Sequence, residues 1–141
     1  VMDFHTGLGP FGKAIFLAPN AHPDVIARAA AIWGHAAFSG AGPVASYQGL
    51  LIDQFARSLQ ARLCSAVIVE FGTRARETMQ RGHLIHHKLM REGAAASELH
   101  ERLHGEYVAC FYPSESAWKH SVQAEGRAVV SAAVEAAKQR G

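Results

Sequence analysis

The sequence predicts an α/β fold in which a few buried strands are flanked by many helices. The first observation is the run AVIVEF at residues 66–71, which is β-branched and apolar on both faces, as expected for a strand covered by helices on both sides. The second is the apolar run at residues 1–5, which leads into a turn rich in glycine and proline. The third is a set of longer stretches in which apolar residues recur at helical spacing.

The first half of the chain is expected to mix strands with helices. Pro23 and Asp24 mark a helix start, because proline at the first position and an acid in the first turn both favour a helix N-terminus. The elements expected here are a strand over residues 1–5, a turn over 7–12, a strand over 13–19, a helix over 25–38, a breaker over 39–43, a short edge strand over 44–47 and a helix over 50–63.

The second half is expected to be helical after its one strand. Gly72 closes that strand, and Trp118, like Trp33 earlier, falls on an apolar helix face and is expected in the core. The helices expected here cover residues 74–91, 97–109 and 114–139, with a break at 111–113. A length of 141 residues suits a single domain over residues 1–141.

Composition narrows the class of protein. Hydrophobic residues make up 49% and charged residues 18%, which is typical of a globular chain. The net charge is +2 and no basic run is present, so we expect no nucleic-acid partner. No apolar run is long enough to span a bilayer, so we expect no membrane partner. Cys64 and Cys110 stand singly in apolar contexts, which favours buried free thiols and a cytoplasmic location.

Two residues in the strands are candidates for chemistry. His5 shares a strand face with Asp3, and a metal-ligating histidine commonly donates its other ring N–H to a carboxylate. The alternative is a histidine satisfied by backbone groups at a strand end. Glu70 is the single charge in its buried strand, so it must be paired, metal-bound or raised in pKa. The structural alternative for Glu70 is an ion pair to Arg74 or Arg76.

These segments together resemble a known family. D-x-H-T-G-L-G-P from Asp3, with E-F-G-T from Glu70, resembles an uncharacterised bacterial branch of the zinc carboxypeptidase superfamily, which includes succinylglutamate desuccinylase and aspartoacylase. The segment FYPSESAWK and the helix after it resemble the same branch, so that the likeness extends from Val1 to about Val130. It implies a mixed sheet flanked by helices, of which this chain would be the C-terminal part.

The resemblance implies a zinc-dependent hydrolase of peptide or N-acyl amino-acid amide bonds, acting on a small peptide or an acylated amino acid. His5 matches the third zinc ligand of the family, and Glu70 matches the residue that activates water and then protonates the leaving amine. Asp3 would then orient His5. A catalytic zinc has three protein ligands and one open position, which agrees with these roles.

One part of the family pattern is absent. The chain contains no H-x-x-E segment, which supplies two zinc ligands in the family, and one histidine cannot retain catalytic zinc. The apolar run also starts at residue 1, so we expect the chain to be the C-terminal part of a larger catalytic domain and to be inactive alone. The alternative is a non-catalytic remnant that acts as a binding or assembly module. Partners would be a missing N-terminal portion or a second copy in a homo-oligomer.

A second histidine pattern competes with this hypothesis. Residues 100–104 spell H-E-R-L-H, in which His100 and His104 share a helix face and Glu101 could act as a base. Glu125 is a conceivable third ligand. The polar flanks instead favour a solvent-facing helix, as they do for the histidines on the preceding predicted helix, His83, His86 and His87.

Overall fold

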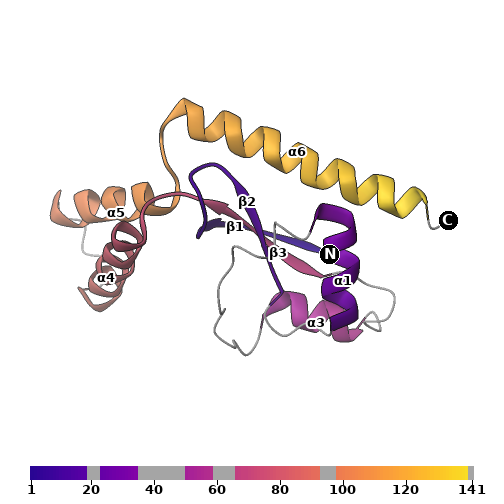
Figure 1. Ribbon diagram of the computed structural model, residues 1–141. Coiled ribbons are helices and arrows are strands. Elements are labelled where there is room, and N and C mark those ends of the chain that lie inside the picture. The colour runs from indigo at the N-terminus through magenta and orange to yellow at the C-terminus, as the bar shows by residue number, and fades with distance from the viewer. Residues whose placement is uncertain (19–22, 35–49, 59–65, 93–97, 140–141) are drawn as a thin grey trace.

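The computed structural model describes residues 1–18, 23–34, 50–58, 66–92 and 98–139 (Figure 1). These residues form a mixed sheet with helices on both faces, which confirms the predicted α/β class. The predicted edge strand at 44–47 and Cys64 lie outside the described residues. The elements are β1 (Met2–Gly7), β2 (Ala14–Leu17), α1 (Pro23–Trp33), α3 (Leu51–Ser58), β3 (Val67–Gly72), α4 (Arg76–Glu92), α5 (Glu98–Phe111) and α6 (Ser116–Lys138).

The sheet has β3 at its centre, in the order β1-β3-β2. β1 runs parallel to β3, with His5 opposite Glu70, whereas β2 runs antiparallel to it. Every residue of β3 is buried, as its β-branched and apolar composition predicts. The first two strands therefore lie on either side of a strand that follows them much later in the chain.

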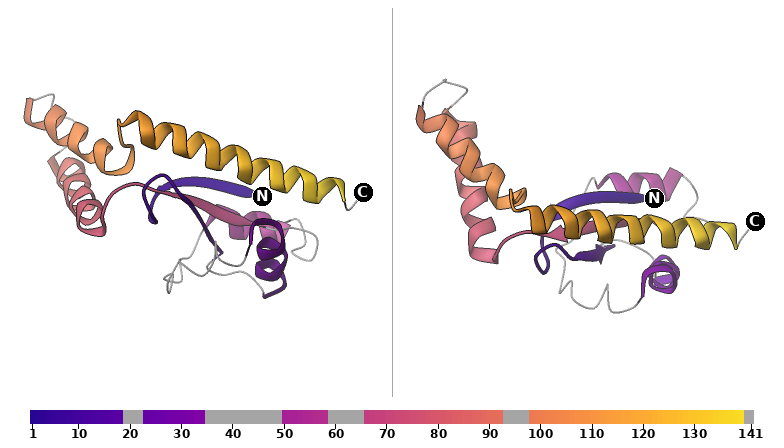
Figure 2. Two further views of the ribbon diagram at one scale, coloured as in Figure 1. Left: turned by 45° about the horizontal axis from the view of Figure 1, so that its top comes forward. Right: turned by 90° about the horizontal axis from the view of Figure 1, so that it is seen from above.

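Alternation along the strands divides the apolar core between the two faces of the sheet. On one face, Phe16, Val69 and Phe71 pack with Val129 of α6. On the other face, Leu17 and Ile68 pack with Ile52 of α3. Figure 2 shows α6 running along β1 on the first of these faces. Each face is thus covered by helices drawn from distant parts of the sequence.

The observed helices differ from the expected ones mainly at their ends. The helix expected to reach Phe38 is described only as far as Trp33, where Gly34 adopts a left-handed φ of 93°. The Gly34 N–H donates to the Ala30 carbonyl at 2.7 Å, so this glycine ends the helix in the usual way. The last helix begins at Ser116, two residues later than expected.

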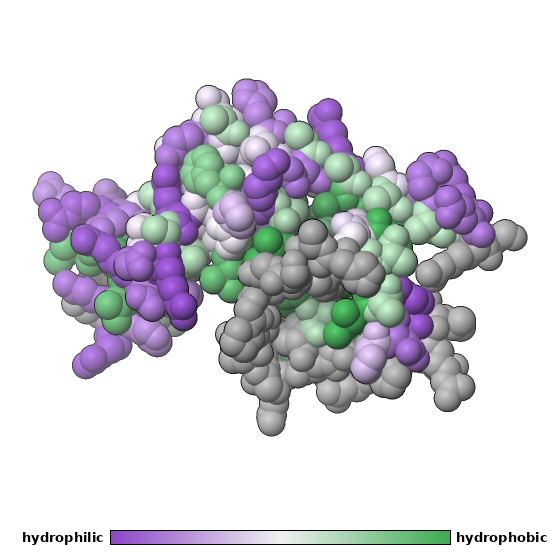
Figure 3. Space-filling view, in the orientation of Figure 1, coloured by the Kyte–Doolittle hydropathy of each residue, from purple (hydrophilic) through white to green (hydrophobic). Residues whose placement is uncertain are grey.

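Helices α4 and α5 form a hairpin that projects from one end of the sheet (Figure 1). Gly82 allows the close approach, since a Cβ there would lie 2.8 Å from Phe111 and 3.0 Å from the Cβ of Cys110. Cys110 is a buried free thiol, as predicted. On the face shown in Figure 3, hydrophilic residues cover much of the hairpin, while apolar residues gather around the strands beneath α6. Of the described helices, none has both the length and the apolar character needed to cross a bilayer.

Trp118 anchors the start of α6 to the sheet. Its side chain is 2% exposed, and the indole N–H donates to the Gly72 carbonyl at 2.8 Å. Trp33 similarly donates to the Val129 carbonyl at 3.0 Å and stacks on Phe16. Both tryptophans therefore belong to the core, as their positions on apolar helix faces predict.

Replacing Trp118 by phenylalanine is expected to lower the free energy of unfolding by about 2 kcal/mol. The change removes the indole hydrogen bond and leaves a small gap, although the Gly72 carbonyl keeps a bond from the Gly12 N–H. Urea unfolding measures the loss, with Tyr112→Phe as the control because Tyr112 is exposed and packs edge-on against Trp118. Equal midpoints for the Trp118 variant and the parent would contradict the anchoring role.

Candidate metal and catalytic site

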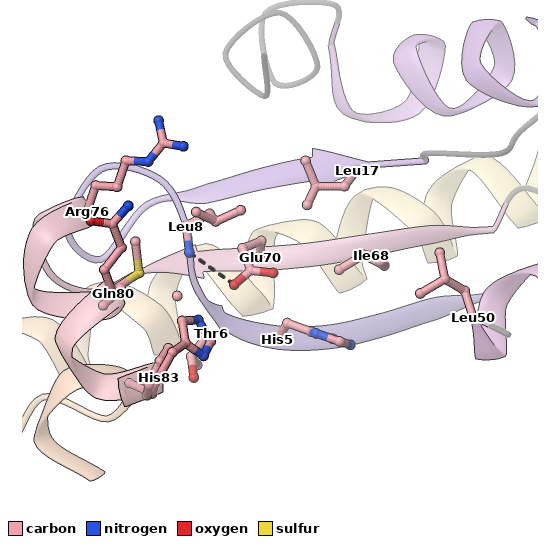
Figure 4. Close-up of a pocket in the computed structure, with 13 residues that line it drawn as sticks. His5, Thr6, Leu8, Leu17, Leu50, Ile68, Glu70, Arg76, Gln80 and His83 are labelled. Atoms are coloured by element: carbon pink, nitrogen blue, oxygen red, sulfur yellow. Dashed lines mark hydrogen bonds between the residues drawn. The ribbon is translucent and has the colours of Figure 1, made fainter. Parts of the chain in front are cut away.

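His5 and Glu70 line one pocket of about 520 Å³ at the end of the parallel strand pair (Figure 4). They stand opposite one another in the β1–β3 register. Residues at the same register of paired strands point to the same face of a sheet, so both side chains lie on the side covered by α3. The pocket lies at the carboxyl ends of these two strands, where open α/β sheets place ligands.

Glu70 is a carboxyl group held in a poorly solvated wall. Its residue is 8% exposed, and Oε1 accepts a hydrogen bond from the Leu8 N–H at 3.1 Å. Burial raises the pKa of Glu70 above its ordinary value, against the opposing effects of that hydrogen bond and of the nearby His5. A carboxyl group whose pKa is raised by burial holds a proton more readily than an exposed one, which suits a group that accepts and returns protons.

The turn after β1 fixes the position of this carboxylate. A Cβ on Gly7 would lie 2.8 Å from Oε1 of Glu70, so a side chain at this position would displace the carboxylate. The carbonyl of Gly7 accepts bonds from the backbone N–H of Thr73 at 3.0 Å and from its hydroxyl at 3.2 Å. Gly7 of the segment T-G-L-G therefore supports the site through its backbone carbonyl and its lack of a side chain.

His5 is oriented by Asp3, its predicted neighbour on the strand face. Nε2 of His5 lies 3.0 Å from Oδ2 of Asp3, and their side chains are 45% and 29% exposed. When the imidazole is neutral, this contact places the proton on Nε2 and leaves the lone pair of Nδ1 for a ligand. The structure thus brings Asp3, His5 and Glu70 to one face of the sheet.

Helix α4 contributes three polar residues that the sequence analysis did not assign to the site. Arg76, Gln80 and His83 line the same pocket from one face of the helix. Their spacing of four and three residues, on a helix that directly follows the Glu70 strand, is the signal that could have identified them. They give the pocket hydrogen-bond donors beyond those of His5.

The structural alternative for Glu70, an ion pair to Arg74 or Arg76, is not what the described residues show. Arg74 instead forms a double hydrogen bond to the Glu115 carboxylate, at 2.6 and 2.8 Å. This pair lowers the pKa of Glu115 below its ordinary value. Within the described residues, Glu70 therefore lies in the pocket with the Leu8 N–H as a hydrogen-bond donor and without an ion pair to Arg74 or Arg76.

The donors at the pocket fit part of a zinc site. An imidazole with its second nitrogen held by a carboxylate is a typical zinc ligand, and His5 has that arrangement. Within the described residues, however, no three His, Cys, Asp or Glu side chains are close enough to hold a metal ion together. The described part of the chain therefore offers one imidazole suited to bind zinc and an adjacent buried carboxyl group.

The competing histidine pair lies on α5, as its spacing predicts. His100 is half-buried and His104 is exposed, and neither joins a three-residue metal cluster in the described ranges. Glu125 lies on α6, where it accepts a hydrogen bond from Lys13 at 2.7 Å. On α4, His86 stacks on Tyr107 at 5.2 Å, whereas His83 lies over Phe111 at the edge of the pocket.

Comparison with known proteins identifies the family of the chain. Residues 1–125 match the profile of the family described as "Protein of unknown function (DUF2817)". No curated protein matched, and no solved structure matched. The matched range includes β1, β3 and the pocket between them. The chain therefore belongs to the DUF2817 family.

Proposed function

We propose that His5 and Glu70 belong to the active site of a zinc-dependent hydrolase of peptide or N-acyl amino-acid amide bonds, related to the zinc carboxypeptidase superfamily. One observation carries the proposal. Two motifs whose key residues are 65 positions apart place an imidazole and a buried carboxylate opposite each other at the mouth of one pocket. Pairing of a metal ligand with a base of raised pKa is what metal-assisted hydrolysis requires.

Each residue of the site has a distinct role in the proposed reaction. Zinc, when bound, polarises the substrate carbonyl and makes water more acidic. His5 supplies one ligand through Nδ1, while Asp3 keeps the ring in place through Nε2. Glu70 accepts the proton of the attacking water and returns it to the leaving amine, and burial supports this exchange by raising the pKa of the carboxyl.

The family resemblance assigns two further zinc ligands to an H-x-x-E segment, which the 141 residues do not contain. We expect the isolated chain to lack hydrolytic activity for this reason. The buried free thiol of Cys110 supports a reducing compartment, and we propose the cytoplasm as the location.

Zinc content of the natural gene product that carries these residues tests the proposal. His5→Ala is expected to lower the zinc bound per chain about tenfold after dialysis, as loss of a zinc ligand does. His100→Ala is the matched control and is expected to leave zinc content unchanged. If the His100 variant loses its zinc and the His5 variant retains it, the metal binds at the H-E-R-L-H helix, which contradicts the proposal.

One observation favours a second candidate function, a non-catalytic binding or assembly module. Phe4 of β1 is 47% exposed and lines a groove with the apolar residues Val122 and Val130, and contiguous exposed apolar patches mark interaction sites. A gene product that contains no zinc, and whose zinc content is the same after His5→Ala, would favour this function over hydrolysis.

A further inference from the structure

We infer that the substrate of the pocket is an N-acyl amino acid with an apolar acyl chain, and that Arg76 and Gln80 of α4 bind its carboxylate. This assignment rests on the proposed function, because it concerns the substrate of the same pocket. It gives a role to the side chains of α4 that line the pocket, and it selects one substrate class among those that an amide hydrolase could accept.

The pocket has walls of opposite chemical character at its two ends (Figure 4). At one end lie side chains that can donate hydrogen bonds to an anion, namely Arg76, Gln80 and His83. At the other end lie aliphatic side chains, namely Leu17, Leu50 and Ile68. Glu70 lies between these two sets. A ligand whose amide bond is placed at Glu70 therefore meets donors on one side and apolar groups on the other.

The order of these walls follows from the direction of β3. Residues i and i+2 of a strand share a face, so Ile68 lies about 7 Å before Glu70 on the same side of the sheet. Leu17 is paired with Ile68 in the register and continues the apolar wall onto β2. Beyond Glu70 the strand ends at Gly72, and α4 begins at Arg76. The apolar wall thus precedes Glu70 along β3, and the polar wall follows it.

Packing of α4 against the turn after β1 fixes the helix face that lines the pocket. Met79 is 7% exposed, and its sulfur lies 3.8 Å from the position that a Cβ on Gly7 would take. Arg76 and Gln80 are four residues apart, so their side chains leave the helix one turn apart on the same face. A guanidinium beside an amide NH₂ offers enough donors to bind both oxygens of one carboxylate.

Arg76 differs from the two arginines nearest to it in the sequence. Arg74 binds the Glu115 carboxylate through two hydrogen bonds, and Arg81 forms an ion pair with Glu106. In the part of the chain that the structure describes, no carboxylate pairs with Arg76, although its side chain lines the pocket. The guanidinium is thus placed to pair with an anion that the ligand supplies.

The apolar wall favours an acyl chain over a continuing peptide. A peptide on that side of the amide bond would place further backbone N–H and C=O groups against the wall, where burial without a hydrogen-bond partner is costly. The side chains that line this end are aliphatic, and Leu17 and Ile68 are 5% and 7% exposed. A chain of methylene groups instead gains from contact with them. The acyl side of the substrate is therefore assigned to the end at Ile68, and the amino-acid carboxylate to α4.

The test measures binding of three small amides by titration calorimetry. It uses the natural gene product that carries these residues, after a chelator has removed any metal, so that the probes are bound but not hydrolysed. N-Hexanoylglycine has both the carboxylate and the apolar chain, N-hexanoylglycinamide lacks the charge, and N-acetylglycylglycine replaces the methylene groups by a peptide group. We expect N-hexanoylglycine to bind about fivefold more tightly than either of the others.

Two variants of α4 locate the carboxylate. Arg76→Gln is expected to weaken binding of N-hexanoylglycine about fivefold and to leave binding of N-hexanoylglycinamide unchanged, because only the first probe has a charge for Arg76 to bind. Arg91→Gln makes the same change on the same exposed helix but outside the residues that line the pocket. This control is expected to bind both probes as the parent does.

The outcomes separate this assignment from the proposed function. Absent binding of N-hexanoylglycine, or equal binding of it by the parent and by Arg76→Gln, overturns the assignment even when the zinc test supports hydrolysis. Tighter binding of N-acetylglycylglycine also overturns it, since the substrate would then be a peptide. A gene product that contains no zinc but binds the three probes in the expected order contradicts hydrolysis and keeps Arg76 as the residue that binds the carboxylate.

Discussion

Replacing Glu70 by glutamine is expected to stabilise the fold at neutral pH and, under the proposed function, to lower hydrolysis about 10³-fold. Glutamine can still accept the Leu8 N–H bond, but it cannot accept and return a proton. The stability gain arises because burial outweighs both the Leu8 bond and the His5 charge, so the ionised carboxylate is disfavoured in the folded state. We expect about 1 kcal/mol, or roughly 4 °C in Tm.

The pH dependence of this gain has a defined sign. The pKa of Glu70 is raised in the folded state, so its protonation contributes stability below the ordinary value of 4.5, and that contribution is lost as pH rises through the folded pKa. Glu70→Gln should therefore match the parent near pH 4 and become the more stable of the two as pH rises through the folded pKa of Glu70. Thermal unfolding across this range measures the difference, with the exposed Glu135→Gln as control. A Glu70→Gln variant that is less stable than the parent at pH 8 would show that the ionised Glu70 carboxylate stabilises the fold, which contradicts this prediction.

Replacing Gly72 by alanine is expected to lower the free energy of unfolding by about 3 kcal/mol. A Cβ at this position would lie 2.1 Å from the Pro10 carbonyl oxygen and 2.3 Å from that of Gly9. Both obstacles are backbone atoms of the β1–β2 turn, which is tied to Gly72 by a hydrogen bond from the Gly12 N–H. The turn must move as a whole, and it carries the Leu8 N–H that holds Glu70.

Gly105→Ala provides the comparison, since nothing lies within 4 Å of a Cβ placed there on helix α5. That variant is expected to gain about 0.5 kcal/mol, because alanine is a better helix former than glycine. Urea unfolding of the two variants under the same conditions measures both effects. A loss below about 1 kcal/mol for Gly72→Ala would show that the turn adapts freely, and the tight placement of Glu70 would then lose its physical basis.

Local sequence patterns predict the strands and helices well but not how they pair. The run at residues 66–71 identifies a central strand because its composition suits burial on both faces. Nothing local indicates that this strand inserts between β1 and β2, since that order depends on contacts between distant segments. Helix ends also shift, as at Trp33, where Gly34 ends a helix whose apolar pattern continues.

The residues of the candidate site could likewise be predicted only in part from the sequence. His5, Asp3 and Glu70 can be selected from the sequence, because each is a polar residue in an apolar strand or at its end. The α4 side chains cannot be identified in this way, because the face of α4 that lines the pocket depends on the direction in which the helix leaves β3. Arg74 illustrates the limit: its partner is Glu115, far along the chain, and not the nearby Glu70.

The order of the strands also has a consequence for how the chain acquires its structure. Met2 pairs with Val67, so among the described strands neither β1 nor β2 has a neighbour until β3 has been synthesised. Such long-range pairing slows folding, because the chain loses the entropy of a large loop before any strand contact forms to offset that loss. Phe4 and Phe16 remain uncovered in the nascent chain during this interval, which makes it the period most open to aggregation and to chaperone binding.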